Sequence, residues 1–394
     1  MMTNDNQRHG RKVHIAFLSK DFPCGGAERV TCDVGNWLCS HGFAVTVFVM
    51  NHLQENYPKG FQRLFDVKPL PKGNILWSPR VAKAIRDAVL REKVDILVTY
   101  QKQRYAAWLK AKTGVKMVFV LHNPPFHELL GLSVAIGEAH PFKRSLLQVW
   151  KKVMDMDYYR KYQKVYHWAD AYGVLCQSFK DQLTKNLNLP ADNKVCVLPN
   201  SVPLPTDVNL DKEKIILYLG RFAHIQKRVD RLLRIWKIVQ PQLPDWKLEI
   251  VGGGVEDASL RAMATTLELK NIAFEGPTNQ AKMYYDKASI LCMTSSYEGW
   301  PLVLAEAQAN GVVPILYNSF TAVTAVVSSK EEGVLIEPFD EEAYAKALVA
   351  LAKDDERRKR MQLRVIEKAK TYSIDNTGAA WLQMVRRVLN EDRG

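Results

Sequence analysis

The 394-residue sequence has no long apolar run, and we expect no secretory signal. Because no stretch of about 18 consecutive apolar residues occurs, we predict no membrane-spanning helix. The first twelve residues, MMTNDNQRHGRK, are polar and lack the apolar core of a signal peptide. We therefore expect the mature protein in the cytosol.

Cysteine is scarce, and its spacing excludes the common cysteine-based sites. The six cysteines form no CxxC pair, and no Cys/His cluster has the spacing of a zinc site. Cys176, Cys196 and Cys292 lie in or beside strand-like runs, where we expect reduced core thiols, as is usual in the cytosol. The six are Cys24, Cys32, Cys39, Cys176, Cys196 and Cys292.

Positive charge is present in excess, and only in the first half of the chain. The net charge is +13, and residues 1–200 hold 29 Lys/Arg against 16 Asp/Glu, while residues 201–394 hold 26 of each. Such asymmetry favours an anionic partner, namely nucleic acid, an acidic membrane face or a phosphorylated substrate. The alternative is a solvated basic surface without a partner. No nucleic-acid-binding motif occurs, so nucleic acid is not expected.

The chain is long enough for two domains of nearly 200 residues each. In the first half, short β-branched runs alternate with helical patterns, and the segment 78–93 predicts an amphipathic helix with Ser78 as cap and Pro79 in its first turn. This βαβ series predicts a parallel sheet with helices on both faces. The expected strands are 13–19, 43–50, 95–100, 116–122 and 171–176.

The alternation stops at VCVLPN (195–200) and restarts after a proline-bearing segment, so we expect a linker over 201–213. The fold class predicted is α/β, with two doubly wound, Rossmann-like domains: residues 1–200 and 214–375. Ligands of such sheets bind outside the carboxyl ends of the strands, which two facing sheets would place in a cleft between domains. The second set of strands is expected at 215–220, 247–253, 289–295, 312–318 and 333–338.

Two strand-end loops of the first half could bind a ligand. Gly25 and Gly26 follow the first strand, where adjacent glycines let backbone amides approach an anion, although the pair could equally form only a tight turn. The loop is not GxGxxG, and no acid ends the second strand, which argues against NAD. His122 ends the strand 116–122 before two prolines, and a catalytic and a structural histidine remain equally open there.

In the second half, Arg221 follows the strand 215–220 and Lys227 opens the next helix. Two fixed cations near a helix N-terminus suit a diphosphate and need no metal, although an ordinary basic loop is the alternative. VGGG (251–254) offers either further backbone amides or a tight turn, and the residues alone do not separate these possibilities.

The stretch YEGWPLVLAEA (297–307) carries two acids, Glu298 in a loop and Glu306 inside a helix expected to start at Pro301. They would lie roughly 8–12 Å apart, too far for a shared proton but suited to holding separate parts of one elongated ligand. This spacing suits a nucleotide sugar. Between the acids, three backbone amides could bind phosphate: those of Trp300, Leu302 and Val303.

Taken together, these segments resemble the retaining GT-B glycosyltransferases of family GT4. The resemblance covers nearly the whole chain, and its most specific block is the E-x7-E motif from Glu298 to Glu306. One mild departure is Trp300, where phenylalanine is common in the family, and we expect it to alter packing only. The other matching segments are GGAERV, LHN, VLPNSV, GRFAHIQKRVDRLL, VGGG and FEGP.

The resemblance implies roles for particular residues. It implies that Glu306 binds the ribose, that Arg221 and Lys227 neutralise the diphosphate, and that His122 lies beside the donor sugar. The implied catalytic set is Glu298, His122, Arg221 and Lys227. The implied donor-binding set is Gly25, Gly26, Arg221, Lys227, Glu298, Gly299, Trp300, Pro301, Leu302, Val303 and Glu306.

The resemblance also implies a mechanism: retaining transfer by front-face displacement, in which the leaving diphosphate accepts the acceptor's proton. No Asp-x-Asp-type pair suggests a metal, and we expect neither metal nor cofactor; the donor, with UDP as the family's preference, is a substrate. The first domain would bind the acceptor, and a last helix over 376–394 would cross back to it.

The segment 142–168 predicts a long helix in which basic residues alternate with aromatic ones, a composition suited to an anionic membrane surface. A scaffold helix whose aromatics pack inward is the equal alternative. A lipid-diphosphate-linked sugar would be an anionic acceptor at such a surface.

We therefore expect a hexose or N-acetylhexosamine to be moved to a lipid-linked or surface-polysaccharide acceptor, as in lipopolysaccharide biosynthesis, at the inner face of the cytoplasmic membrane. The alternatives are a nucleotide-sugar epimerase of the same fold and a non-catalytic protein that binds a sugar nucleotide or an anionic surface.

Overall fold

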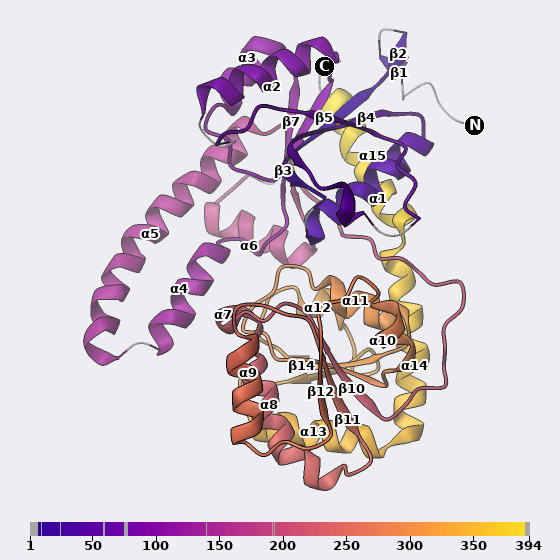
Figure 1. Ribbon diagram of the computed structural model, residues 1–394. Coiled ribbons are helices and arrows are strands. Elements are labelled where there is room, and N and C mark those ends of the chain that lie inside the picture. The colour runs from indigo at the N-terminus through magenta and orange to yellow at the C-terminus, as the bar shows by residue number, and fades with distance from the viewer. Residues whose placement is uncertain are drawn as a thin grey trace. The chain divides into compact units, whose positions relative to one another are not determined.

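The computed structural model describes residues 7–8, 10–23, 25–57, 60–74, 78–138, 140–190, 192 and 194–390, so Cys24 lies outside the described residues. The chain divides into two compact units (Figure 1). Unit 1 comprises Met1–Pro125, Lys152–Ser201 and Ile374–Gly394, and unit 2 comprises Phe126–Lys151 and Val202–Ser373. This division differs from the expected domains because residues 126–151 group with unit 2 and the last segment of unit 1 begins at Ile374.

The described part of unit 1 is built on a seven-stranded parallel sheet with the order β5-β4-β3-β6-β7-β8-β9. Its central strands are buried on both faces, which explains their nearly continuous apolar sequences. All five strands expected in this half are confirmed, and the sequence missed β5 and β9. The strands are β3 (His14–Phe22), β4 (Ala44–His52), β5 (Asp66–Pro69), β6 (Ile96–Thr99), β7 (Lys116–Leu121), β8 (Ala171–Val174) and β9 (Val195–Val197).

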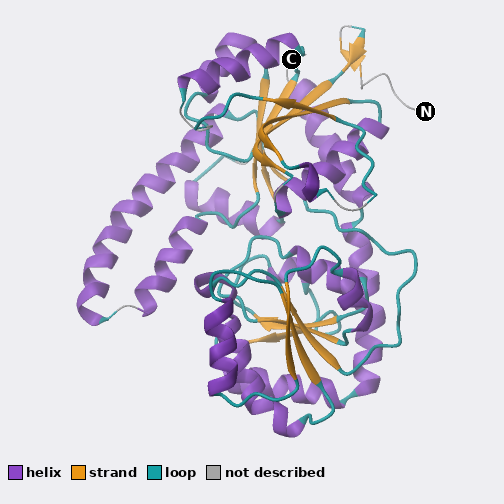
Figure 2. Ribbon diagram, in the orientation of Figure 1, coloured by secondary structure: helices purple, strands orange, loops and turns teal. Residues whose placement is uncertain are grey.

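Helices flank the strands of this sheet (Figure 2). The predicted cap is confirmed, since the amide of Val81 donates to Oγ of Ser78 at the start of α2. A short antiparallel pair, β1 (Gln7–Arg8) and β2 (Arg11–Lys12), and the 3-10 turn η2 (Gln54–Asn56) complete the unit. Its helices are α1 (Gly26–Ser40), α2 (Pro79–Arg91), α3 (Ala106–Thr113), α6 (Gln177–Leu187) and α15 (Ile374–Asn390).

Helix α15 packs against α1 (Figure 1). Nε1 of Trp37 donates to Oδ1 of Asp375 at 2.9 Å, and the Phe17 and Trp381 rings lie 5.6 Å apart. A Cβ on Gly378 would lie 2.2 Å from the Trp37 ring, so glycine lets the two helices approach closely. The C-terminal helix is thus part of the core of unit 1.

The described part of unit 2 is built on a six-stranded parallel sheet with the order β12-β11-β10-β13-β14-β15. The five expected strands are confirmed, and the sequence missed β12. Strand order reverses between β10 and β13, as it does between β3 and β6 in unit 1, and ligands of doubly wound sheets bind at such switch points. The strands are β10 (Ile215–Leu219), β11 (Lys247–Val251), β12 (Ile272–Gly276), β13 (Ile290–Met293), β14 (Val313–Tyr317) and β15 (Val334–Ile336).

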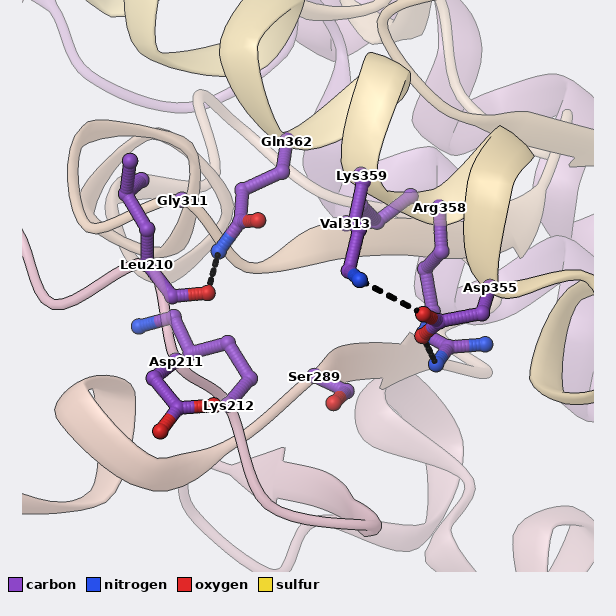
Figure 3. Close-up of a pocket in the computed structure, with 10 residues that line it drawn as sticks. All are labelled: Leu210, Asp211, Lys212, Ser289, Gly311, Val313, Asp355, Arg358, Lys359 and Gln362. Carbon is purple, nitrogen blue, oxygen red and sulfur yellow. Dashed lines mark hydrogen bonds and ion pairs between the residues drawn. The ribbon is translucent and has the colours of Figure 1, made fainter.

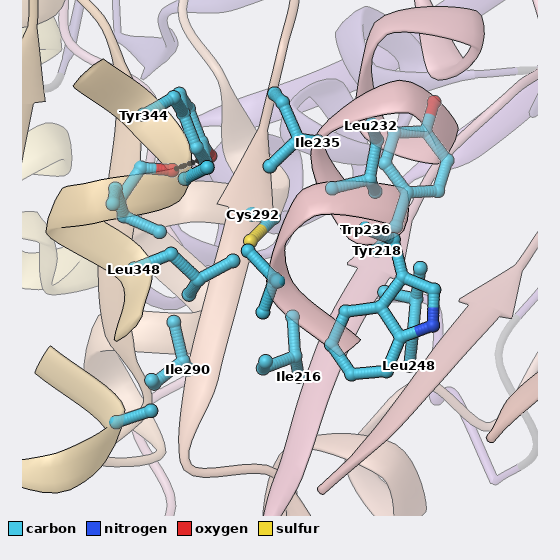
Figure 4. Packing of buried hydrophobic residues seen from close by; sticks show 14 of the residues in the cluster. Ile216, Tyr218, Leu232, Ile235, Trp236, Leu248, Ile290, Cys292, Tyr344 and Leu348 are labelled. Atoms are coloured by element: carbon cyan, nitrogen blue, oxygen red, sulfur yellow. Dashed lines mark hydrogen bonds between the residues drawn. The ribbon is translucent and has the colours of Figure 1, made fainter. Parts of the chain in front are cut away.

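A continuous apolar core joins this sheet to helices α8 and α13 (Figure 4). Two large polar side chains in it are satisfied: Nε1 of Trp236 donates to the Lys270 carbonyl, and the Tyr344 hydroxyl donates to the Ile315 carbonyl. The helices are α4 (His127–Glu138), α7 (His224–Lys227), α8 (Val229–Val239), α9 (Asp257–Thr266), α10 (Lys282–Lys287), α11 (Leu302–Ala309), α12 (Val323–Val326), α13 (Glu341–Lys353) and α14 (Asp355–Ala369), with 3-10 turns η3 (Gln240–Gln242) and η4 (Lys370–Tyr372).

The predicted long helix is confirmed as α5 (Pro141–Trp168), which is continuous across the division at Lys151 and Lys152. Within the part of the chain that the structure describes, no helix combines the length and the apolar character needed to cross a bilayer.

Candidate functional site

The two loops that carry most of the predicted site leave neighbouring strands of unit 2 at the same edge. Strands β10 and β13 pair in parallel, with Ile216 opposite Ile290. The loop after β10 carries Arg221 and leads into α7, and the loop after β13 carries Glu298 and leads into α11. Since strand order reverses between these two strands, both loops lie at the switch point of the sheet.

Glu298 and Lys227 form a nearly buried ion pair between these loops. Nζ of Lys227 lies 2.7 Å from Oε1 of Glu298, and their side chains are 17% and 6% exposed. The same carboxylate oxygen accepts the hydroxyl of Ser295 at 2.6 Å, and Oε2 lies 3.4 Å from Nε2 of Gln226. Ser295 and Gln226 were not predicted. Both lie within three residues of a predicted site residue along the chain.

Further hydrogen bonds hold the two loops against each other. The amide of Ser296 donates to the Gln226 carbonyl at 2.7 Å, and the Thr294 hydroxyl donates to the Arg228 carbonyl at 2.9 Å. Nη1 of Arg231 donates to the Ser296 hydroxyl at 3.2 Å. The position of the ion pair is therefore fixed by backbone contacts as well as by its own charges.

Helix α11 begins one residue later than predicted, because Pro301 is the capping residue and Leu302 the first helical one. The Pro301 carbonyl accepts from the amides of Leu304 and Ala305. Trp300 is buried against Tyr372, with ring centroids 5.0 Å apart. Four amides before and within the first turn find no acceptor among the described residues, and unpartnered amides at a helix N-terminus are suited to an anion. They belong to Gly299, Trp300, Leu302 and Val303.

Glu306 is buried in α11 and has a different set of partners from Glu298. Its Oε2 accepts a hydrogen bond from the Tyr285 hydroxyl at 3.0 Å. Tyr285 comes from α10, and no local pattern in the sequence pointed to it. The two acids therefore do not share a proton in this structure.

Arg221 is exposed, and its guanidinium has no hydrogen-bond or ion-pair partner within the described part of the chain. Its backbone is fixed, however, because the Tyr218 hydroxyl donates to the Arg221 carbonyl at 3.0 Å. Burial, and then the nearby charge of Glu298, raise the pKa of Tyr218, so this hydroxyl stays protonated as a donor. The exposed guanidinium is thus available to an anion.

The VGGG segment (251–254) packs against the loop that carries Arg221. A Cβ on Gly252 would lie 1.8 Å from the Gly220 carbonyl oxygen, and one on Gly254 would lie 2.3 Å from the Phe222 carbonyl oxygen. The amide of Phe222 donates to the Gly253 carbonyl at 2.8 Å. Gly252 and Gly254 are therefore required because two backbone segments pack closely here. The sequence alone had left open whether this segment offers backbone amides or forms a tight turn.

The remaining predicted residues lie in unit 1, at the matching edge of the other sheet. Gly25, with a φ of +98°, precedes α1, and Gly26 is its first residue. This turn follows β3, a strand at the switch point of the sheet. A positive φ explains glycine at position 25, whose carbonyl accepts a hydrogen bond from the Arg29 amide at 3.2 Å.

His122 directly follows β7, and burial lowers its pKa to about 4, so the ring is neutral near pH 7. Its Nε2 is buried without a partner among the described residues, and its ring meets that of Tyr100 edge-on at 4.6 Å. Two further buried atoms, Oε1 of Gln101 and Oε1 of Gln103, are also without a partner there. Neither glutamine was predicted. Polar atoms that need partners therefore gather beyond β6 and β7.

The structure thus brings one predicted group together within unit 2: Arg221, Lys227, Glu298, Gly299, Trp300, Pro301, Leu302, Val303 and Glu306. Gly25, Gly26 and His122 belong to unit 1. No group of three or more His, Cys, Asp or Glu side chains in the described part of the chain is arranged to hold a metal ion.

A cavity of about 150 Å³ lies at the opposite edge of the unit 2 sheet, and no predicted site residue lines it (Figure 3). Ser289 and Val313 line it at the amino ends of β13 and β14. Its polar groups are largely bound to one another or to backbone: Gln362 donates to the Leu210 carbonyl, and Lys212 to three carbonyls. We assign this cavity no role in the site.

Comparisons with known families agree with this geometry. Residues 24–204 match the model of Glycosyltransferase Family 4, and residues 205–368 match that of Glycosyl transferases group 1. The chain belongs to the GT4 family of glycosyltransferases and has the GT-B fold.

Two curated relatives differ in how much they share with the chain. It is 24% identical over 389 residues to the GalNAc-alpha-(1->4)-GalNAc-alpha-(1->3)-diNAcBac-PP-undecaprenol alpha-1,4-N-acetyl-D-galactosaminyltransferase of Campylobacter jejuni, covering 96% of this chain and 99% of the relative. It is 34% identical over 165 residues to an uncharacterized glycosyltransferase of Haemophilus influenzae, covering 42% of this chain and 45% of the relative. The chain thus spans about half the length of the second relative.

Two solved structures share the fold at low sequence identity. Sucrose-phosphate synthase from Thermosynechococcus elongatus has a TM-score of 0.75 and 17% identity, with 96% of this chain and 100% of that one covered. Anabaena Alr3699/HepE in complex with UDP-glucose has a TM-score of 0.73 and 14% identity, with 96% and 99% covered.

Proposed function

We propose that this protein is a retaining glycosyltransferase that moves a hexose or N-acetylhexosamine from a UDP-sugar to a lipid-linked or surface-polysaccharide acceptor. The observation that carries the proposal is the Glu298–Lys227 pair beside the four unpartnered amides that open α11. A carboxylate accepts sugar hydroxyls, and a cation with helix amides binds phosphate. A nucleotide sugar needs both kinds of contact at adjacent points.

In this proposal the bond between the sugar's anomeric carbon and the diphosphate breaks while the bond to the acceptor oxygen forms on the same face. The acceptor proton passes to the leaving diphosphate. Arg221, Lys227 and the α11 amides stabilise the negative charge that builds there, and such donors contribute most when charge develops next to them. Glu306 accepts the ribose hydroxyls, and no metal takes part.

The acceptor binds unit 1, where neutral His122 and the glutamines after β6 offer unpartnered polar atoms. Support for a lipid-linked acceptor comes from the Campylobacter relative, whose name gives an undecaprenol diphosphate-linked saccharide as its substrate. Support for UDP comes from the Anabaena structure, which holds UDP-glucose. The basic excess of residues 1–200 suits an anionic acceptor at the cytosolic face of an anionic membrane.

The test is transfer of radiolabel from a panel of UDP-sugars to an undecaprenyl diphosphate-linked saccharide, with the lipid product extracted and counted. We expect label in the lipid, an unchanged anomeric configuration by NMR, and activity that persists in EDTA. Lys227→Met should abolish transfer, whereas Lys237→Met, which changes an exposed lysine of α8, should not.

Each alternative gives a different result in the same assay. An epimerase would convert one UDP-sugar into another and leave the lipid unlabelled. A non-catalytic binding protein would shift its thermal unfolding with UDP and turn over no donor. Loss of all activity in EDTA, restored by a divalent metal, would contradict the metal-free clamp of Arg221 and Lys227.

A further inference from the structure

Helix α5 exposes an apolar stripe to solvent. Val149, Trp150, Val153 and Met156 are 64%, 52%, 58% and 58% exposed. Single exposed apolar residues are ordinary, but these four lie within eight positions of one helix. Val149, Val153 and Met156 follow the i, i+4, i+7 spacing of one helix face, and Trp150 is three residues before Val153 on the side of that face. We call these four residues the α5 stripe.

The rest of α5 is anchored in protein, so the stripe is not simply a poorly packed helix. Tyr162, Val165 and Tyr166 are buried. Nζ of Lys102 lies 3.7 Å from the centre of the Tyr162 ring. The aromatic residues near the end of α5 therefore belong to the core of unit 1, as the scaffold alternative predicted for them. The surface available for docking is confined to the earlier part of the helix.

Positive charge borders the α5 stripe along the helix. Arg160 continues it at i+4 from Met156, Lys164 follows at i+4 from Arg160, and Lys152 lies three residues after Val149. These three basic residues are exposed. Residues 142–168 contain seven Lys/Arg and two Asp, and one of the acids, Asp157, is already paired with Lys161 at 2.5 Å.

Apolar side chains bordered by cations complement one kind of surface best. An anionic bilayer offers phosphate groups for the lysines and arginine and an acyl boundary for the apolar side chains. A second copy of this chain would bring the same basic face against itself, and like charges repel across such a contact. Charge complementarity therefore favours lipid over self-association.

We propose that the α5 stripe inserts into the surface of an anionic bilayer, with Lys152, Arg160 and Lys164 on the lipid phosphates. The inference rests on the proposed function, since it names the surface that brings the enzyme to a lipid-linked acceptor. It replaces the broader expectation for the segment 142–168 with four inserting side chains and a basic border.

The test is flotation of the full-length protein with phosphatidylcholine vesicles and with vesicles that also contain phosphatidylglycerol. We expect binding to the anionic vesicles only, weakening as salt rises, because salt screens the basic border. The double variant Val153→Glu/Met156→Glu and the double variant Lys152→Glu/Lys164→Glu should each lower the partition by at least about tenfold. Leu363→Glu on α14 and Lys346→Glu on α13 are matched exposed controls and should bind like wild type.

Folding and catalysis are measured on the same proteins. All variants should keep the wild-type thermal unfolding, UDP affinity and transfer to a water-soluble acceptor with a short lipid chain. Wild-type vesicle binding in the first double variant would overturn the inference. A concentration-dependent dimer that wild type forms and Val153→Glu/Met156→Glu loses would also overturn the inference, because the stripe would then be a protein interface. Vesicle binding as expected without any sugar transfer would overturn the proposed function and leave the α5 stripe standing.

Discussion

Nζ of Lys227 lies 2.7 Å from Oε1 of Glu298, and this contact joins the loops that follow β10 and β13 at the point where strand order reverses. The pair is nearly buried, so each charge depends on the other. An arriving diphosphate would compete with Glu298 for the lysine, and Glu298 would then be free to accept a sugar hydroxyl. In the proposed mechanism, donor binding and rearrangement of this pair would therefore be coupled.

Lys227→Met should destabilise the protein by about 3 kcal/mol, because it leaves a buried carboxylate without its cation. Glu298→Gln should cost less, since the amide still accepts from Ser295 and leaves the more exposed partner unpaired. The double variant should be more stable than Lys227→Met alone. Urea unfolding followed by circular dichroism checks all three.

The same variants separate stability from catalysis. All three should lose sugar transfer by orders of magnitude, including the one whose stability recovers, because a clamp for the diphosphate or an acceptor for the sugar is missing in each. Wild-type turnover in Glu298→Gln would show that this carboxylate is only a structural partner of Lys227.

The sequence predicted the strands that are buried on both faces, because such strands are continuous apolar runs. It missed β5, β9 and β12, and all three are edge strands of their sheets. Asp66–Pro69 and Ile272–Gly276 are largely half-exposed or exposed, so their residues follow no clear pattern of burial. Edge strands carry a weaker sequence signal because one side of each makes no strand pairing.

For the site, the sequence predicted the residues that the motif carries and missed those that the fold supplies. Arg221, Lys227, Glu298 and the α11 amides do lie at one switch point. Tyr285 reaches Glu306 from a different helix, 21 residues earlier in the chain, and periodicity contains no information about such contacts.

Glu306→Ala should weaken UDP binding by roughly 5- to 150-fold, because a buried ribose hydroxyl would lose its acceptor at a cost of about 1–3 kcal/mol. Tyr285→Phe should weaken it less, since the carboxylate remains and loses only its positioning hydrogen bond. Isothermal calorimetry with UDP measures both effects. Equal affinities in wild type and Glu306→Ala would mean that Glu306 serves only to bind Tyr285.

Gly254→Ala should reduce transfer on the order of 100-fold, because a misplacement of about 1 Å in a positioning loop can cost that much. The new Cβ would lie 2.3 Å from the Phe222 carbonyl oxygen, so the loop that carries Arg221 must move. Gly253→Ala is the matched control, since its Cβ would lie no closer than 3.6 Å, against the Pro277 side chain. Steady-state kinetics should show nearly normal turnover in the control. Similar losses in both variants would mean that the glycine segment acts through flexibility and not through its packing on the Arg221 loop.

Lys212 should make the stability of unit 2 rise with pH in alkaline solution. The pKa of Lys212 is lowered from 10.5 to about 8, and burial is the largest cause of this shift. The side chain donates to the carbonyls of Tyr285, Asp286 and Asn310. Between pH 8 and 10.5 the unfolded chain therefore binds more protons at this residue than the folded protein, so raising the pH favours folding. Below the folded pKa both states are protonated, and the burial penalty stays constant.

The full pKa shift would correspond to a gain of about 3 kcal/mol in the free energy of unfolding. The partial exposure of the side chain reduces this expected gain to roughly 1 kcal/mol. The measurement is the difference in unfolding free energy between wild type and Lys212→Met at a series of pH values, since the other titrating groups are common to both proteins. The difference should move in favour of wild type as the pH rises from 8 to 10.5 and stay level from 6 to 7. A difference that is flat across the alkaline range would show that the three carbonyls hold the lysine charged in the folded state.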